Sequence, residues 1–132
     1  MEHKAVAPFT IEGWDEDVYD ERPGARLSRT RITKTFTGDF AGTSEAETLM
    51  CVAPVERSAA YVGFERLLGS LHGRAGSFVL HHTASGSGGQ RDGSWTIVPD
   101  TGTGELTGIT GAGEIVVAEG GAHTLVLVYD LG

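Results

Sequence analysis

Apolar residues recur at every second position through most of this sequence, and glycine interrupts them at short intervals. Such alternation is typical of β-strands with one buried face, and the helical period is nearly absent. Glycine accounts for 20 of the 132 residues, about twice its usual share of ~7%. It stands between the alternating runs, where tight turns need its conformational freedom. The pattern therefore predicts an all-β chain of short strands and tight connections.

About eight alternating runs are present, and we expect a strand from each. They cover residues 7–14, 27–37, 46–52, 59–68, 77–83, 94–98, 114–118 and 124–131, with a short extra run at 105–106. The acidic residues after the first run, as far as Pro23-Gly24, and the Gly/Ser segment 85–89 are expected to be loops.

Short connections make neighbouring strands antiparallel, and a sheet without covering helices must protect its edges. Closure into a barrel does this best, whereas a two-sheet sandwich is the alternative. We therefore expect a single domain over residues 1–132, built as one antiparallel β-barrel of about eight strands, of the general lipocalin type.

The charge balance and the cysteine count narrow the range of partners and compartments. A formal net charge of −8 argues against nucleic acid and anionic membranes as partners, because both attract basic surfaces. One cysteine, Cys51, cannot form an internal disulfide, and the first residues lack the apolar segment of a signal peptide. We expect a cytoplasmic protein.

Several runs are apolar at consecutive positions and would therefore be apolar on both faces. Phe78 and Leu80 point to one side and Val79 to the other, and the last run behaves in the same way. One face can fill the barrel, and the other would pack on a short helix, on a chain terminus or on a second subunit. This pattern predicts a homo-oligomer.

No cofactor or metal is expected. The glycines at 102–113 do not form a dinucleotide-binding pattern, and neither lysine stands in a phosphate-binding loop. His81 and His82 are adjacent on a strand, so they point to opposite faces and cannot chelate one ion together.

Acidic residues are the candidates for catalysis. Glu45 and Glu47 share one strand face: in the barrel interior they would raise one another's pKa, and in solvent they would only add solubility. Glu65 and Arg66 point to opposite faces, so one of them enters the interior and needs a partner there. Glu65 could pair with Arg29 or Arg31, and Arg66 with Glu45 or Glu47, either to fix the register or to serve a function.

A second set of strand residues could line a ligand site rather than only pack the core. Its members are aromatic or lie beside the acidic candidates, and they are Tyr61, Phe64, Arg66, Phe78 and Trp95.

Several segments, taken in order, resemble a bacterial family of uncharacterised proteins, the domain-of-unknown-function 3224 group. The resemblance covers nearly the whole chain, and the segments that carry it are Trp14-Asp15-Glu16 with Tyr19, residues 31–39, residues 61–66, residues 73–82 and residues 102–108. It implies a small barrel of the allene-oxide-cyclase type. Where the family segment usually carries glutamine before its histidine, this chain has His81.

The resemblance implies no assigned activity, but cyclases of the same barrel class steer a reactive substrate inside an apolar cavity. By this fold-level analogy we expect a small apolar molecule in the barrel, and cofactor-free cyclisation or isomerisation is one use for such a site. Glu65, Glu45 or Glu47 would supply a carboxyl group with a shifted pKa, and His82 would be its proton partner. The alternative is a non-catalytic carrier, or an oligomeric accessory protein with a filled barrel.

Overall fold

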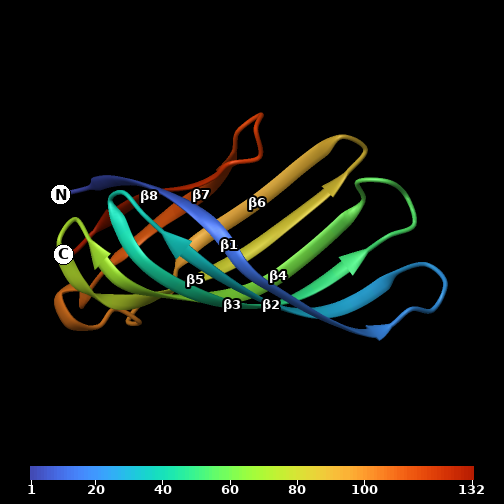
Figure 1. The fold of residues 1–132 in the computed structure, drawn as a ribbon, viewed down its shortest axis with the longest axis horizontal. Coiled ribbons are helices and arrows are strands. Elements are labelled where there is room, and N and C mark those ends of the chain that lie inside the picture. Colours follow the sequence, from blue (N-terminus) through green and yellow to red (C-terminus); the bar gives the residue numbers. More distant parts are fainter.

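Eight long strands make up most of the protein, and the computed structural model describes all residues 1–132 (Figure 1). The strands are β1 (His3–Asp20), β2 (Arg26–Phe36), β3 (Phe40–Val52), β4 (Ala59–Leu71), β5 (Arg74–Ser87), β6 (Gln90–Ile97), β7 (Thr110–Val117) and β8 (His123–Asp130). A single 3₁₀ turn, η1 (Gly104–Leu106), lies between β6 and β7, where the sequence predicted a short strand-like run.

The strands form one antiparallel sheet in chain order, and β8 returns to pair with β1, so the sheet closes in a ring. Both chain termini lie at the same end of this ring (Figure 1). None of the helical structure has the length or the apolar character that crossing a membrane requires.

The acidic segment expected as a loop is instead the second half of β1, and this part of the prediction was wrong. Asp15 and Asp17 stand opposite Arg31 and Arg29 in the register with β2. Opposite charges across a strand pair stabilise the extended pairing, so Asp15 and Asp17 lie on an outer strand face rather than in a solvated loop. Likewise, residues 85–87 continue β5, and the turn is confined to Gly88 and Gly89.

One end of the ring is packed solid with apolar side chains. Phe36 and Phe40 meet edge to face at a centroid distance of 5.3 Å, and Phe78 packs on Phe40 in the same way at 6.1 Å. Leu106 of η1 and Ile109 close this end, and both are fully buried. The interior here is a core with no room for a ligand.

Gly76 allows η1 to close the packed end. A Cβ at this position would lie 2.1 Å from the carbonyl oxygen of Thr103, far inside contact distance. The Ser77 amide donates a hydrogen bond to Thr103 Oγ1 at 3.0 Å, which ties the η1 segment to β5. Only glycine permits this approach of the two backbones.

The other end of the ring is open because its strands differ in length. The strands β2 to β5 have 11 to 14 residues, whereas β6, β7 and β8 have 8 each. β6 and β7 pair only through Trp95 with Gly113 and Thr96 with Ala112. β1 pairs with β8 only as far as Phe9. The interior is therefore uncovered beside the second half of β1.

Candidate functional site

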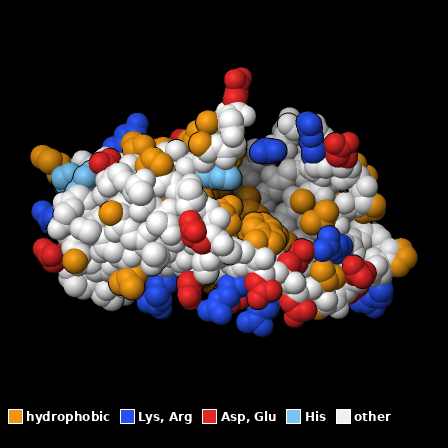
Figure 2. Space-filling model, in the orientation of Figure 1, with side chains coloured by type: hydrophobic (Ala, Val, Ile, Leu, Met, Phe, Trp, Pro, Cys, Tyr) orange, Lys and Arg blue, Asp and Glu red, His pale blue; other side chains and the backbone are white.

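A cavity of about 820 Å³ occupies the open end of the ring. Figure 2 shows the hollow on one face of the molecule, with hydrophobic side chains inside it. Its wall includes Met50, Tyr61, Trp95 and Ile115, and charged groups such as Arg91 also line it. A largely apolar wall with a few polar groups is the usual composition of a small-molecule site.

A smaller recess of about 140 Å³ shares part of this wall. Tyr61 and His123 line both spaces, whereas Lys34 and His82 line only the recess. The recess therefore brings buried polar groups within reach of a cavity that is otherwise mostly apolar.

Glu65 is the centre of this polar group, with only 1% of its surface exposed. Lys34 Nζ donates a hydrogen bond to it at 3.3 Å, and Ser44 Oγ donates a second one. His82 Nε2 lies 2.7 Å from Glu65 Oε1, a close contact in which Nε2 makes no hydrogen bond of standard geometry. A buried carboxylate needs such partners, and here three strands besides its own supply them.

The partners of Glu65 outweigh the cost of burying its charge. Burial by itself raises the pKa of this carboxyl group, but the contacts with His82, Lys34 and Ser44 lower it, and the result is a pKa of about 2 instead of 4.5. Glu65 is therefore an ionised hydrogen-bond acceptor at neutral pH.

His82 connects Glu65 to the cavity wall. Its Nδ1 atom lies 3.2 Å from the hydroxyl oxygen of Tyr61, at hydrogen-bond distance. In the sheet register His82 stands opposite Gly63, which lies between Tyr61 and Glu65 on the inner face of β4. Because Gly63 has no side chain, the imidazole ring can lie between the other two. A chain of contacts thus runs from Glu65 through His82 to Tyr61.

Tyr61 is a neutral phenol in this setting. Burial raises the pKa of its hydroxyl, the nearby indole N–H of Trp95 opposes the rise, and the charge of Glu65 adds to it. Trp95 also meets the edge of the His82 ring at a centroid distance of 6.2 Å, and its buried Nε1 has no hydrogen-bond partner of standard geometry.

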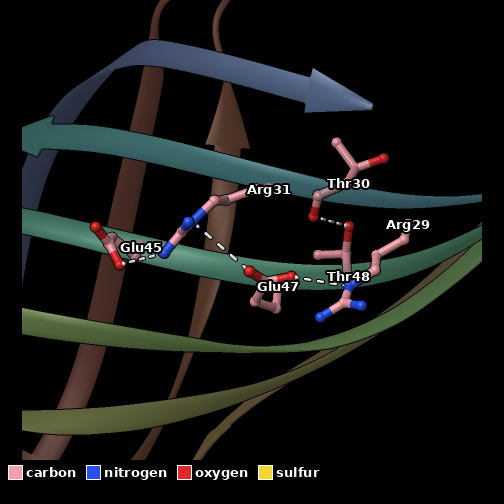
Figure 3. A network of polar contacts seen from close by, with 6 residues as sticks. All are labelled: Arg29, Thr30, Arg31, Glu45, Glu47 and Thr48. Atoms are coloured by element: carbon pink, nitrogen blue, oxygen red, sulfur yellow. Dashed lines mark hydrogen bonds and ion pairs between the residues drawn. The ribbon is translucent and has the colours of Figure 1, made fainter. Parts of the chain in front are cut away.

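Glu45 and Glu47, considered as a catalytic pair, lie outside the ring. Arg31 contacts both, at 3.1 Å and 3.6 Å, and Arg29 contacts Glu47 at 3.4 Å (Figure 3). The inner positions of β3 belong to Ser44, Ala46 and Thr48, so the alternation of the strand places both glutamates in solvent. The arginines that were expected to meet Glu65 are thereby engaged on the outer face.

The residues predicted to line a ligand site are likewise divided between the inside and the outside of the ring. Tyr61 and Trp95 line the cavity, whereas Phe78 packs in the solid end. Phe64 and Arg66 lie on the outer face of β4, where 56% of the Phe64 surface is exposed. His81, also on the outside, stacks on Phe64 at a centroid distance of 5.1 Å.

Sequence reasoning missed Lys34, Ser44 and His123. Lys34 alternates with Ile32 and Phe36 along β2 and so occupies an inner position. The position of Lys34 in this alternation was a usable sign that its side chain points inward. The ammonium group of Lys34 lies 4.6 Å from the centroid of the Phe9 ring, a favourable arrangement for a buried cation.

Comparison with known proteins shows one family and one fold. A family model described as "Protein of unknown function (DUF3224)" matches residues 5–129. A crystal structure of a protein of unknown function from the same family, from Shewanella oneidensis MR-1, is 32% identical in sequence and has a TM-score of 0.92, over 100% of this chain and 98% of that one. No curated protein matches the sequence.

Proposed function

Because this chain belongs to the DUF3224 family, for which no activity is described, the function has to be inferred from its site, and we propose that it binds a small, mostly apolar organic molecule inside the open end of the ring. In this proposal the sheet is a true β-barrel of the allene-oxide-cyclase or lipocalin type, and the cavity is its mouth. The observation that carries the proposal is the cavity of about 820 Å³ with a mostly apolar wall.

The shape of the interior supports a ligand rather than a filled barrel. Phe40, Phe78 and Leu106 are fully buried and fill one end, so the open end has a rigid floor. Met50, Trp95 and Ile115 leave the space above that floor free. A pre-formed cavity costs little reorganisation on binding, which favours affinity for apolar molecules of matching size.

The ligand in this proposal carries one polar group. Its apolar part contacts the cavity wall, and a carbonyl or hydroxyl group enters the recess lined by Lys34, Tyr61 and His82. Buried polar groups of this kind select for a partner with complementary hydrogen bonds.

The neutral fluorophore 1-aminoanthracene tests the proposal. We expect saturable binding, with a rise in fluorescence and quenching of Trp95. The quenching is best followed in a Trp14→Phe background, which leaves Trp95 as the one tryptophan; because Trp14 itself lines the recess, the affinity of this background is first compared with that of the wild type. Ala84 lines the cavity, and Ala84→Phe should place a phenyl ring beside Tyr61 and Trp95, narrow the cavity there and weaken binding by about tenfold or more.

Thr83→Phe is the matched control, because Thr83 is the next residue on β5 and faces outward. It should bind the fluorophore like the wild type. Equal affinities in Ala84→Phe and the wild type, or no saturable binding at all, would contradict a ligand site in the ring.

A further inference from the structure

The contacts from Glu65 through His82 to Tyr61 form a carboxylate–imidazole–hydroxyl series that ends at the cavity wall. Simple ligand binding needs no such series. Its order matches the arrangement with which enzymes activate a hydroxyl group, in which the carboxylate orients the ring and the ring accepts the hydroxyl proton.

The contacts allow one arrangement of hydrogens that would make this series work. Glu65 is ionised and acts as an acceptor, so the tautomer that suits it carries the His82 ring hydrogen on Nε2, 2.7 Å from the carboxylate. In that tautomer Nδ1 has a free lone pair, which faces the Tyr61 hydroxyl at 3.2 Å. The phenol donates its hydrogen to His82, and its oxygen lone pairs remain available to a molecule in the cavity.

We propose that Tyr61 acts as a general base on carbonyl compounds in the cavity, with His82 and Glu65 as its proton relay. The proposal rests on the proposed ligand site and assigns it a substrate class: apolar ketones or related carbonyl compounds with a hydrogen on the carbon next to the carbonyl. The reaction is a reversible proton transfer that needs no cofactor, and it leads to isomerisation when the proton returns at another position.

The step balances within the site. The Cα–H bond of the ligand breaks and its proton goes to the Tyr61 oxygen, while the phenol proton moves to His82 Nδ1. The electron pair of the broken bond forms a C=C bond, and the carbonyl π pair moves to oxygen, which gives an enolate. Lys34 lines the recess, and its positive charge, with that of the new imidazolium, stabilises the enolate. Glu65, 2.7 Å from the ring, stabilises the imidazolium.

Exchange of the α-hydrogens of 2-tetralone with D₂O, followed by ¹H NMR, reports this proton transfer directly. This bicyclic ketone is apolar and has acidic hydrogens next to its carbonyl. We expect the wild-type protein to accelerate exchange by at least about tenfold over buffer. Tyr61→Phe should return the rate to that of buffer while binding 2-tetralone with about the wild-type affinity, as should His82→Asn.

The chain offers a matched control for each variant. Tyr19 is exposed, and His81 stacks on the outer face, so Tyr19→Phe and His81→Asn should keep the wild-type exchange rate. Far-UV circular dichroism checks that each variant is folded.

Each unfavourable outcome has a separate meaning. If 2-tetralone binds and its exchange is not accelerated, or if Tyr61→Phe exchanges as fast as the wild type, the relay is wrong and the ligand site stands. If 2-tetralone does not bind even though 1-aminoanthracene does, the substrate class is wrong. If neither molecule binds, the ligand site and the relay fail together.

Discussion

At the scale of single residues, the site depends on one carboxylate that the fold keeps ionised out of contact with water. Lys34 from β2, Ser44 from β3 and His82 from β5 all face Glu65. Each approaches from a different strand, so the ionised state of Glu65 depends on the closed sheet. Its electrostatic contribution therefore belongs to the folded state and is absent from the unfolded chain.

This linkage predicts the acid stability of the protein. The folded-state pKa of Glu65, about 2, lies below its unfolded value of 4.5, so the folded form releases this proton more readily. The stabilisation is complete above pH 4.5 and is lost as the pH falls towards 2, with a magnitude on the order of 3 kcal/mol. Urea unfolding at a series of pH values should show a steeper loss of stability in the wild type than in Glu65→Gln.

Glu47→Gln is the control for this measurement. Glu47 is half-exposed in the Arg29–Arg31 network, where exposed ion pairs contribute about 0–1 kcal/mol. Its pH profile should match that of the wild type. Parallel profiles for the wild type and Glu65→Gln between pH 5 and pH 2 would show that Glu65 is not held ionised.

At the scale of elements, the 3₁₀ turn determines which end of the ring is closed. Leu106 of this turn packs over the core and is fully buried. Gly76 lets the turn approach β5, because a Cβ at this position would lie 2.1 Å from the carbonyl oxygen of Thr103. Because the obstacle is a backbone carbonyl and not a flexible side chain, the segment must move away to accept even a methyl group.

Gly76→Ala should therefore destabilise the protein by roughly 2–4 kcal/mol, in the range of strained or overpacked buried positions. Thermal unfolding measures the loss. Gly120→Ala is the control, because Gly120 has no neighbour within 4 Å and no left-handed backbone conformation. The same melting temperature for both variants would contradict the structural role of Gly76.

Element positions were predictable from the sequence, whereas element ends and partners were not. The alternating runs placed all eight strands, because side-chain alternation is a local property. The second half of β1 was missed because its strand state depends on the arginines of β2 across the register. The pairing of Glu65 with Lys34 was missed for a similar reason: the two residues are 31 positions apart, and only the closed sheet brings them together.

At the scale of the whole molecule, one sheet has two different ends. The strands share a continuous ladder, but only one end has a filled interior. Apolar residues such as Phe64 and Leu68 are exposed on the outer face. Association between copies of the chain, which the sequence predicts, therefore stays a prediction.

This asymmetry predicts a gradient of local stability along the strands. Amides at the filled end, in residues 67–71, 77–80 and 125–129, should exchange with D₂O only at the rate of global unfolding, because buried side chains cover them. Amides at the open end, in residues 52–60 and 86–93, lie beside the cavity or in exposed turns and should exchange faster. Hydrogen exchange resolved by mass spectrometry measures both.

Ligand binding should change only one end. Saturation with 1-aminoanthracene should slow the exchange of the open end and leave the filled end unchanged, because a molecule in the cavity contacts the strand ends around Tyr61 and Trp95. Ala84→Phe should slow exchange at the open end without any ligand, since its side chain occupies the same space. Protection that instead appears at the filled end would place the ligand outside the cavity. Uniform exchange along the strands would mean that the open end is as firmly held as the core, which would contradict the predicted gradient of local stability.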